Sequence, residues 1–188
     1  MIYDLKHYVQ HQKSFLPKTF CDKVLGEMKS IKFEEHTFFN PKTNQYAPIS
    51  GNQELSVSFD NTPSKNELTD RLWNAIKNYK EFINMPWFSS WQGYSAVRFN
   101  AYKENKKMAL HCDHIKDLFD GERKGIPILS VLGVLNDDYE GGEFIMFDDY
   151  EIEFKQGDVV IFPSLFLYPH KVEPVTKGTR YSYISWVW

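Results

Sequence analysis

Apolar residues recur every three or four positions in two stretches of the first half of the chain, residues 17–30 and 64–83. The apolar positions are Phe20, Val24, Leu25 and Met28 in the first stretch and Leu68, Leu72, Ile76, Tyr79 and Ile83 in the second. This spacing predicts two amphipathic helices. Pro17 suits the start of the first helix, and Ser64-x-x-Glu67 predicts a capping box at the start of the second. Both helices are expected to pack on one face of a sheet.

After Gly93 the pattern changes to short apolar runs separated by turn residues. Residues 128–135 form a continuous apolar run, which predicts a strand buried on both faces, and residues 150–155 alternate as a half-buried strand does. Further strands are expected over 94–102, 143–147, 159–162, 168–172 and 181–188. Short strands at this spacing predict a sandwich or barrel that is mainly β, with N-terminal helices.

Two polar segments are candidates for loops around the mouth of such a barrel. Residues 36–54 are broken by Asn40-Pro41 and Ser50-Gly51-Asn52, which predicts a long irregular loop, either a lid or a plain surface excursion. Residues 114–127 carry six charged side chains, which suit a polar or peptide partner better than a lipid. Those side chains are Lys116, Asp117, Asp120, Glu122, Arg123 and Lys124.

Composition narrows the class of protein. With 188 residues, 42% of them hydrophobic, the chain is long enough to bury a core and is most simply one domain. The formal net charge of −3 disfavours nucleic acid as a partner, because a broad basic face is missing. Two cysteines make no disulfide framework, and no apolar run approaches the roughly 20 residues that span a bilayer. The N-terminus lacks a signal-peptide pattern, so a cytoplasmic protein without a membrane partner is expected.

The candidate chemistry centres on His111-Cys112-Asp113 and the distant His170. Because side chains two apart on a strand share a face, His111 and Asp113 can bind one ion while Cys112 points elsewhere. His170 lies in the expected strand 168–172 and can supply a third ligand. Two histidines and one carboxylate form the ligand set of non-haem iron(II) sites that keep open positions.

Nearby polar residues have competing interpretations. Arg180, ten residues after His170, has a guanidinium fork that would bind a carboxylate bidentately. A zinc site made of His111, Asp113 and His114 is an alternative, but it leaves Arg180 unexplained; His114 is expected at the pocket rim instead. Arg98 is either a structural ion-pair residue or a pocket residue.

Several motifs occur in a fixed order along the second half of the chain. After H-x-D at 111–113 come Gly141-Gly142-Glu143-Phe144, Gln156-Gly157-Asp158, Pro169-His170-x-Val172 and Gly178-Thr179-Arg180-Tyr181-Ser182. From about Ser95 to Trp188 this order resembles the iron(II)- and 2-oxoglutarate-dependent dioxygenases, and among them the prolyl 4-hydroxylase-like branch. The resemblance implies a double-stranded β-helix, a jelly-roll or cupin-like barrel. It also implies one dioxygenase domain over 1–188, with 1–93 as helical support and loops and 94–188 as the core carrying the site.

The resemblance also implies roles for individual residues. His111, Asp113 and His170 match the iron-binding and catalytic triad. Arg180 matches the residue that pairs with the far carboxylate of 2-oxoglutarate, Ser182 lies beside it in the R-x-S pattern, and Tyr102 matches a tyrosine placed against the cosubstrate. The chain departs from many relatives at residues 132–134, where Leu-Gly-Val stands in place of a second tyrosine.

The expected function is oxidative decarboxylation of 2-oxoglutarate to succinate, coupled to hydroxylation of a C–H bond. The resemblance implies Fe(II), 2-oxoglutarate and O2, with ascorbate as a candidate reductant, and a prolyl or other residue of a protein or peptide as substrate. Asp113 favours hydroxylation, because halogenating relatives leave this position vacant. The alternatives are oxidation of a free amino acid, another small molecule or an alkylated base, and a non-catalytic cupin-like metal-binding module. The sequence carries no signal for an oligomeric state.

Overall fold

The structure, a computed structural model, describes residues 4–40, 43–48, 53–88, 91, 93–113 and 127–188. Its helices are η1 (Leu5–Tyr8), α1 (Lys18–Met28) and α2 (Lys65–Ile83). None of the helices in these ranges is both long and apolar enough to cross a membrane.

Two antiparallel sheets make up most of the remaining structure. The seven-stranded sheet has the order β1 (Gln10–Gln12), β12 (Val159–Pro163), β8 (Leu129–Val134), β15 (Arg180–Val187), β6 (Arg98–Tyr102), β5 (Ser56–Ser58) and β2 (Glu34–Glu35). The four-stranded sheet has the order β11 (Tyr150–Ile152), β10 (Phe144–Met146), β13 (His170–Val172) and β7 (Met108–His111). Two further pairs join β14 (Val175–Lys177) to β9 (Glu140–Gly141) and β3 (Phe38–Asn40) to β4 (Gln45–Ala47).

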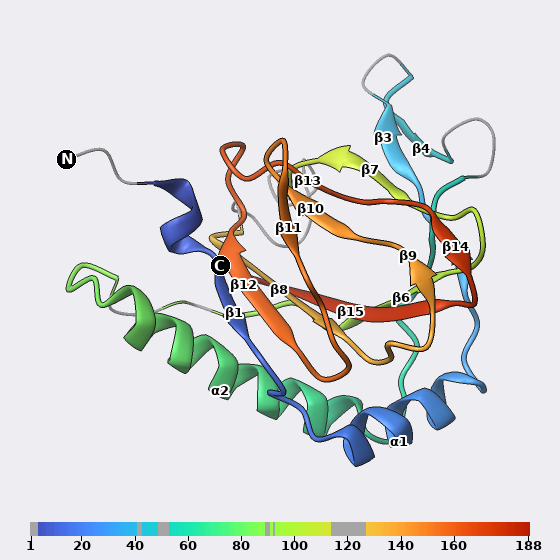
Figure 1. The fold of residues 1–188 in the computed structure, drawn as a ribbon, viewed down its shortest axis with the longest axis horizontal. Helices are drawn as coiled ribbons and strands as arrows, with labels where there is room; N and C mark the ends of the chain where they lie inside the picture. The colour runs from blue at the N-terminus through green and yellow to red at the C-terminus, as the bar shows by residue number, and fades with distance from the viewer. Residues whose placement is uncertain (1–3, 41–42, 49–52, 89–90, 92, 114–126) are drawn as a thin grey trace.

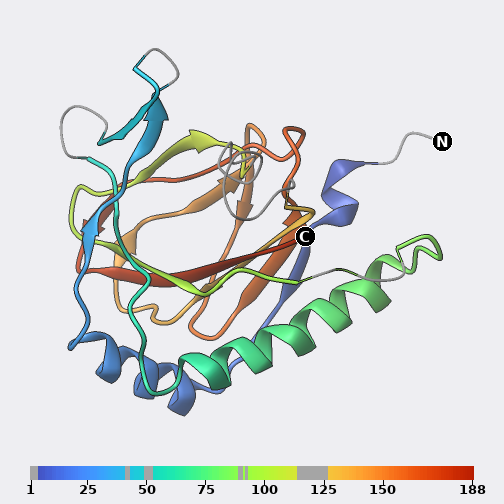
Figure 2. The same cartoon turned by 180° about the vertical axis from the view of Figure 1, so that it is seen from behind.

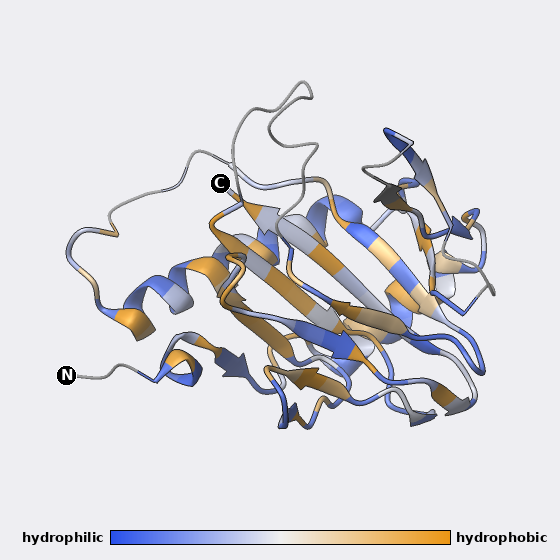
Figure 3. Ribbon diagram, turned by 90° about the horizontal axis from the view of Figure 1, so that it is seen from above, coloured by the Kyte–Doolittle hydropathy of each residue, from blue (hydrophilic) through white to orange (hydrophobic). Residues whose placement is uncertain are grey.

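The apolar core has two layers, one on each face of the seven-stranded sheet. The inner layer lies between the two sheets and includes Leu132 and Ile184 from one and Phe144 from the other. The outer layer joins the sheet to α1 and α2, which run along one side of the barrel in Figures 1 and 2. Figure 3 shows hydrophobic residues concentrated along the central strands. This architecture, mainly β with N-terminal helices, is the double-stranded β-helix that the sequence predicts.

Both predicted helices are confirmed, but the capping box is wrong. Ser64 precedes α2 without making a side-chain cap. Its Oγ instead donates to Glu27 Oε1 at 2.7 Å, and its backbone N–H donates to Glu27 Oε2 at 2.8 Å. Ser64 therefore ties the start of α2 to α1, and its backbone N–H is bound to Glu27 instead of Glu67.

The prediction of an irregular loop over residues 36–54 is also wrong. The segment contains the β3–β4 hairpin, with Phe38 paired to Ala47 and Phe39 to Tyr46, and the hairpin projects on the side opposite the helices (Figure 1). β4 is exposed throughout, so its side chains follow no alternating pattern that would have revealed a strand. Residues 41–42 and 49–52 lie outside the described residues.

The strands of the second half agree with the pattern of the sequence. β8 is buried along its whole length, as the continuous apolar run predicts. β11 buries Ile152 and exposes Glu151, as a half-buried strand does. The sheet also brings Tyr102 of β6 opposite Arg180 of β15, and it pairs Asn100 with Ser182.

Candidate metal centre

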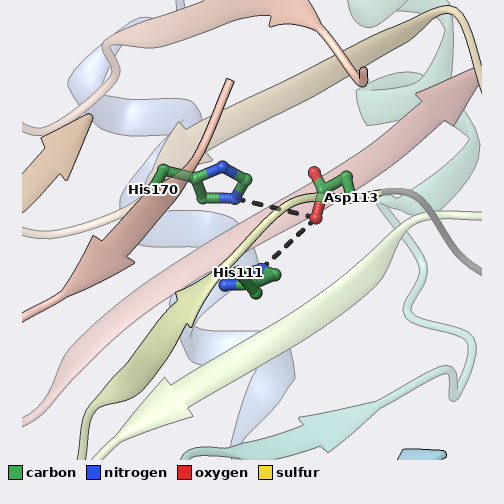
Figure 4. A group of neighbouring side chains, drawn as sticks. All are labelled: His111, Asp113 and His170. Carbon is green, nitrogen blue, oxygen red and sulfur yellow. Dashed lines mark ion pairs between the residues drawn. The ribbon is translucent and has the colours of Figure 1, made fainter. Parts of the chain in front are cut away.

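The H-x-D motif stands at the end of one strand, and the third candidate ligand, His170, begins the strand paired with it. His111 is the last residue of β7, Asp113 follows two residues later, and His170 is the first residue of β13. Antiparallel pairing places His170 directly opposite His111. The Nε2 atoms of His111 and His170 lie 3.4 and 3.6 Å from Asp113 Oδ1 (Figure 4). One ligand atom from each residue falls within 4.8 Å of the others, so the three can hold one metal ion.

Backbone carbonyls orient both imidazoles toward this point. His111 Nδ1 lies 2.8 Å from the carbonyl oxygen of Ala109, and His170 Nδ1 lies 3.0 Å from that of Tyr168. A carbonyl oxygen can only accept, so Nδ1 carries the proton in each ring. Each Nε2 therefore presents its lone pair to the centre, which is the form of histidine that binds a metal.

Asp113 is buried and hydrogen-bonded as an ionised carboxylate. Its Oδ2 accepts a hydrogen bond of 2.6 Å from Ser130, whose Oγ also contacts Ser164 Oγ at 2.7 Å. Burial alone would raise the pKa of Asp113, but His170, His111 and Ser130 outweigh it and hold the pKa well below its usual range. Burial lowers the pKa of His170 to about 4, against the opposing pull of Asp113. Asp113 is therefore an anionic carboxylate beside a neutral His170 imidazole near pH 7.

Arg180, the first residue of β15, lies fully buried in the same interior. It is 0% exposed, and its Nε, Nη1 and Nη2 atoms have no hydrogen-bond partner in the described part of the chain. The guanidinium carbon lies 5.1 Å from the centre of the Tyr102 ring and 5.7 Å from that of Phe154. A buried cation without a counter-charge is costly, so the interior is built for an anionic ligand.

The other predicted cosubstrate residues lie beside Arg180. Ser182 is fully buried and accepts a hydrogen bond of 3.4 Å from Asn100 Nδ2. Tyr102 is also buried, and burial raises the pKa of its hydroxyl although the positive charge of Arg180 opposes the shift.

The departure at residues 132–134 has a packing explanation. A Cβ on Gly133 would stand 2.2 Å from the ring of Tyr183, so this side chain fills the space beside the glycine. Leu132 points the other way, into the inner layer of the core. Position 133 therefore requires glycine.

The N-terminal third adds polar residues that the sequence did not indicate. The carboxylate of Glu54 accepts a hydrogen bond of 3.3 Å from Ala109 N–H and so supports the strand end that carries His111. His36 is buried close enough to Arg98 and Asp113 for their charges to act on its ring. No local motif marks either residue, because the sheet brings them to the site from far away in the chain. His114 and the charged segment 114–126 lie outside the described residues.

The residues present fit the metal and cosubstrate that the motif order implies. A His-Asp-His group on one side of an ion leaves the other coordination positions open. Arg180, whose guanidinium has no partner in the described ranges of the chain, matches a carboxylate in charge and geometry. Fold and site together define a double-stranded β-helix protein with a metal centre of the two-histidine, one-carboxylate class.

Comparison with known proteins gives the family. Residues 97–188 match the 2OG-Fe(II) oxygenase superfamily. PKHD-type hydroxylases from Paraburkholderia phytofirmans and Stenotrophomonas maltophilia are 30% and 36% identical over 148 residues, covering 76% and 75% of this chain. The chain spans only 62% and 61% of the lengths of these two curated relatives.

Solved structures show the same fold at low sequence identity. A prolyl-4-hydroxylase from Pseudomonas putida has a TM-score of 0.67 and 21% identity, with 96% of this chain and 92% of that chain covered. A Trichoplax adhaerens prolyl hydroxylase, in complex with a peptide fragment of the hypoxia inducible factor oxygen degradation domain, has a TM-score of 0.71 and 16% identity. That match covers 97% of this chain and 84% of the other. The chain belongs to the 2OG-Fe(II) oxygenase superfamily, and it is similar to PKHD-type hydroxylases. The family and the His-Asp-His group together imply Fe(II) and 2-oxoglutarate.

Proposed function

We propose that this protein is a 2-oxoglutarate-dependent dioxygenase that hydroxylates a C–H bond of a second substrate. The observation that carries the proposal is the fully buried guanidinium of Arg180, which has no hydrogen-bond partner among the described residues and lies in the same interior as His111, Asp113 and His170. A metal site alone would not need a buried cation beside it. A diacid with one end at the metal and the other at Arg180 accounts for both features.

In this proposal each polar residue has a distinct task. His111, Asp113 and His170 hold Fe(II), and Ser130 fixes the orientation of the Asp113 carboxylate. Arg180 binds the far carboxylate of 2-oxoglutarate, with Ser182 and Tyr102 completing the pocket and the rings of Tyr102 and Phe154 excluding water. When bound, iron and 2-oxoglutarate supply the oxidising chemistry, with O2 consumed and succinate and carbon dioxide released. The protein positions the partners and keeps water out.

The proposed substrate is a prolyl or other residue of a protein or peptide. Support comes from the relatives, which are named as PKHD-type hydroxylases and prolyl hydroxylases, one of them in complex with a peptide. A free small molecule is the competing substrate class. We also propose one domain over residues 1–188, since β1, β2 and β5 from the N-terminal part pair within the main sheet, and a cytoplasmic location with ascorbate as reductant.

Turnover in air tests this function. The protein is incubated with Fe(II), ascorbate, 2-oxoglutarate and a set of proline-containing peptides, and succinate and peptide masses are measured. Wild type should form succinate and add the mass of one oxygen atom to a peptide, and Asp113→Ala should do neither. Oxygen added only to a free metabolite would contradict the peptide substrate. No succinate from the wild type under any of these conditions would contradict the dioxygenase itself.

A further inference from the structure

A second arginine lies on the same inner face of the barrel as Arg180. Along β6, Tyr102 pairs with Arg180, Asn100 with Ser182, and Arg98 with Ile184. Residues directly opposite on neighbouring strands, and every second residue along a strand, share a face. Arg98 therefore points into the interior. It stands four residues before Tyr102 on β6. At ~3.3 Å per residue, the two positions are about 13 Å apart along the strand.

The side chain of Arg98 is held in place from two sides. Its Nε donates to Asn100 Oδ1 at 3.0 Å, and its guanidinium carbon lies 5.0 Å from the centre of the Trp186 ring. Asn100 is fixed in turn by its hydrogen bond to Ser182. The terminal nitrogens of Arg98 make no hydrogen bond or ion pair with any other described residue, and the side chain is only partly buried. A guanidinium fork on the inner face of the barrel, whose terminal donors have no partner among the described residues, can bind a carboxylate bidentately.

Arg98 lies at the metal end of this face, away from Arg180. Ser130, which donates to Asp113, stands opposite Trp186 in the sheet, and Arg98 stacks on that tryptophan. The negative charge of Asp113 acts on Arg98. The proposed cosubstrate already has a place for both of its charged ends, at the metal and at Arg180. Arg98 is therefore available to bind the other substrate, the molecule that is hydroxylated.

His36 adds an unpartnered polar atom at the same place. Its side chain is only 9% exposed, and its Nδ1 has no hydrogen-bond partner among the described residues. The charges of Arg98 and Asp113 both act on this ring. Burial and the neighbouring Arg98 lower the pKa of His36 to about 3, so the ring is neutral and can donate one hydrogen bond. A buried polar atom without a partner is rare, and a bound ligand would supply the missing partner here.

We propose that Arg98 and His36 form a carboxylate-binding subsite for the molecule that is hydroxylated. This inference rests on the proposed function, because it places the subsite next to the oxidising metal. The substrate then carries a carboxylate close to the carbon that is oxidised. That carboxylate is either the α-carboxylate of a free amino acid or the side chain of an acidic residue in a peptide.

Calorimetric titration tests the subsite by binding alone. The protein is loaded with Fe(II) and saturating 2-oxoglutarate without oxygen, so that Arg180 is occupied. N-acetyl-L-proline is compared with N-acetyl-L-prolinamide, and the capped peptide acetyl-Pro-Glu-amide with acetyl-Pro-Gln-amide. At least one carboxylate probe should bind about 10- to 100-fold more tightly than its neutral partner, the range expected for hydrogen bonds to a charged group. The pair that shows the preference identifies the source of the carboxylate.

The same titrations on variants assign the preference to Arg98. Arg98→Gln should abolish it, and Arg98→Lys should keep part of it, because lysine retains the charge but not the fork. Arg71→Gln is the matched control, since Arg71 also stacks on an aromatic ring, that of Phe20, but lies on α2. It should bind the probes as wild type does. If Arg98→Gln does not fold, the lysine variant decides, and an unchanged preference in it overturns the subsite.

Two results overturn the inference outright: wild type with no preference in either pair, or a preference that survives in Arg98→Gln. The outcome is separable from that of the proposed function. Protein that forms succinate but shows no carboxylate preference contradicts only the subsite. Protein that shows the preference but forms no succinate contradicts only the dioxygenase activity.

Discussion

Replacing Arg180 by methionine should stabilise the ligand-free protein while removing its affinity for 2-oxoglutarate. The guanidinium is 0% exposed and its three nitrogens lack partners in the described structure, so folding without a ligand buries an uncompensated charge. Replacing buried charged groups by apolar residues of similar volume often stabilises a protein by about 1–4 kcal/mol. Stacking on Tyr102 and Phe154 offsets part of this, at about 0.5–2 kcal/mol in total.

The net gain expected for Arg180→Met is therefore about 1 kcal/mol. For a protein of this length that corresponds to a rise in Tm of roughly 2–4 °C. Thermal unfolding followed by circular dichroism measures it, with and without metal and 2-oxoglutarate. At a ligand concentration 100 times Kd, wild type should gain about 2.7 kcal/mol and the variant almost nothing.

Arg71→Met provides the matched control for this measurement. Arg71 is partly exposed and pairs with Glu67 on the surface of α2, so its loss should change stability by no more than about 0.5 kcal/mol. The reasoning is refuted if Arg180→Met is less stable than wild type without ligand, or if 2-oxoglutarate stabilises both proteins equally. Either result would mean that an anionic group of the protein itself pairs with the Arg180 guanidinium.

Further predictions concern the support of the metal site, the packing of the sheet and the thiols. Ser130→Ala should weaken metal binding by about 10- to 100-fold, because the liganding carboxylate loses its orienting donor; an unchanged Kd for Co(II) would contradict that role. Gly133→Ala should lower the free energy of unfolding in urea by at least about 1–3 kcal/mol, because the new Cβ meets the Tyr183 ring at 2.2 Å, and an unaltered midpoint would show that the ring can move aside. Native protein should take up one maleimide label, at the partly exposed Cys112. Cys21 is fully buried and burial raises the pKa of its thiol to about 11, so it should react only after unfolding; mass spectrometry of native protein labelled at Cys21 would refute this.

The proximity of the three candidate metal ligands could be predicted because it is local or follows from simple strand rules. His111 and Asp113 share a face through a two-residue spacing, and His170 lies in a run with clear strand character. The long helices and the fully buried β8 were predictable for the same reason, since burial on a fixed face leaves a periodic pattern.

What the sequence could not predict depends on pairing between distant segments. The hairpin after His36 has an exposed strand, so it leaves no burial pattern. Glu54 and His36 reach the site only because the N-terminal segment adds strands to the edge of the main sheet. The sequence alone leaves Arg98 open between an ion pair and a pocket residue, and the sheet register places it on the inner face. Ser64 bonds Glu27 instead of capping its own helix, which only helix packing could reveal.

The central claim is that the three ligand residues and Arg180 together bind iron and 2-oxoglutarate. The most direct measurement is a titration of Fe(II), then 2-oxoglutarate, into metal-free protein without oxygen, following the visible charge-transfer band of the chelated keto acid. The band should form in wild type, be absent in Asp113→Ala, and require roughly 10- to 100-fold more 2-oxoglutarate in Arg180→Met. A wild type that forms no band, and binds zinc at His111, Asp113 and His170 instead, would contradict the account and favour a metal-binding module without this chemistry.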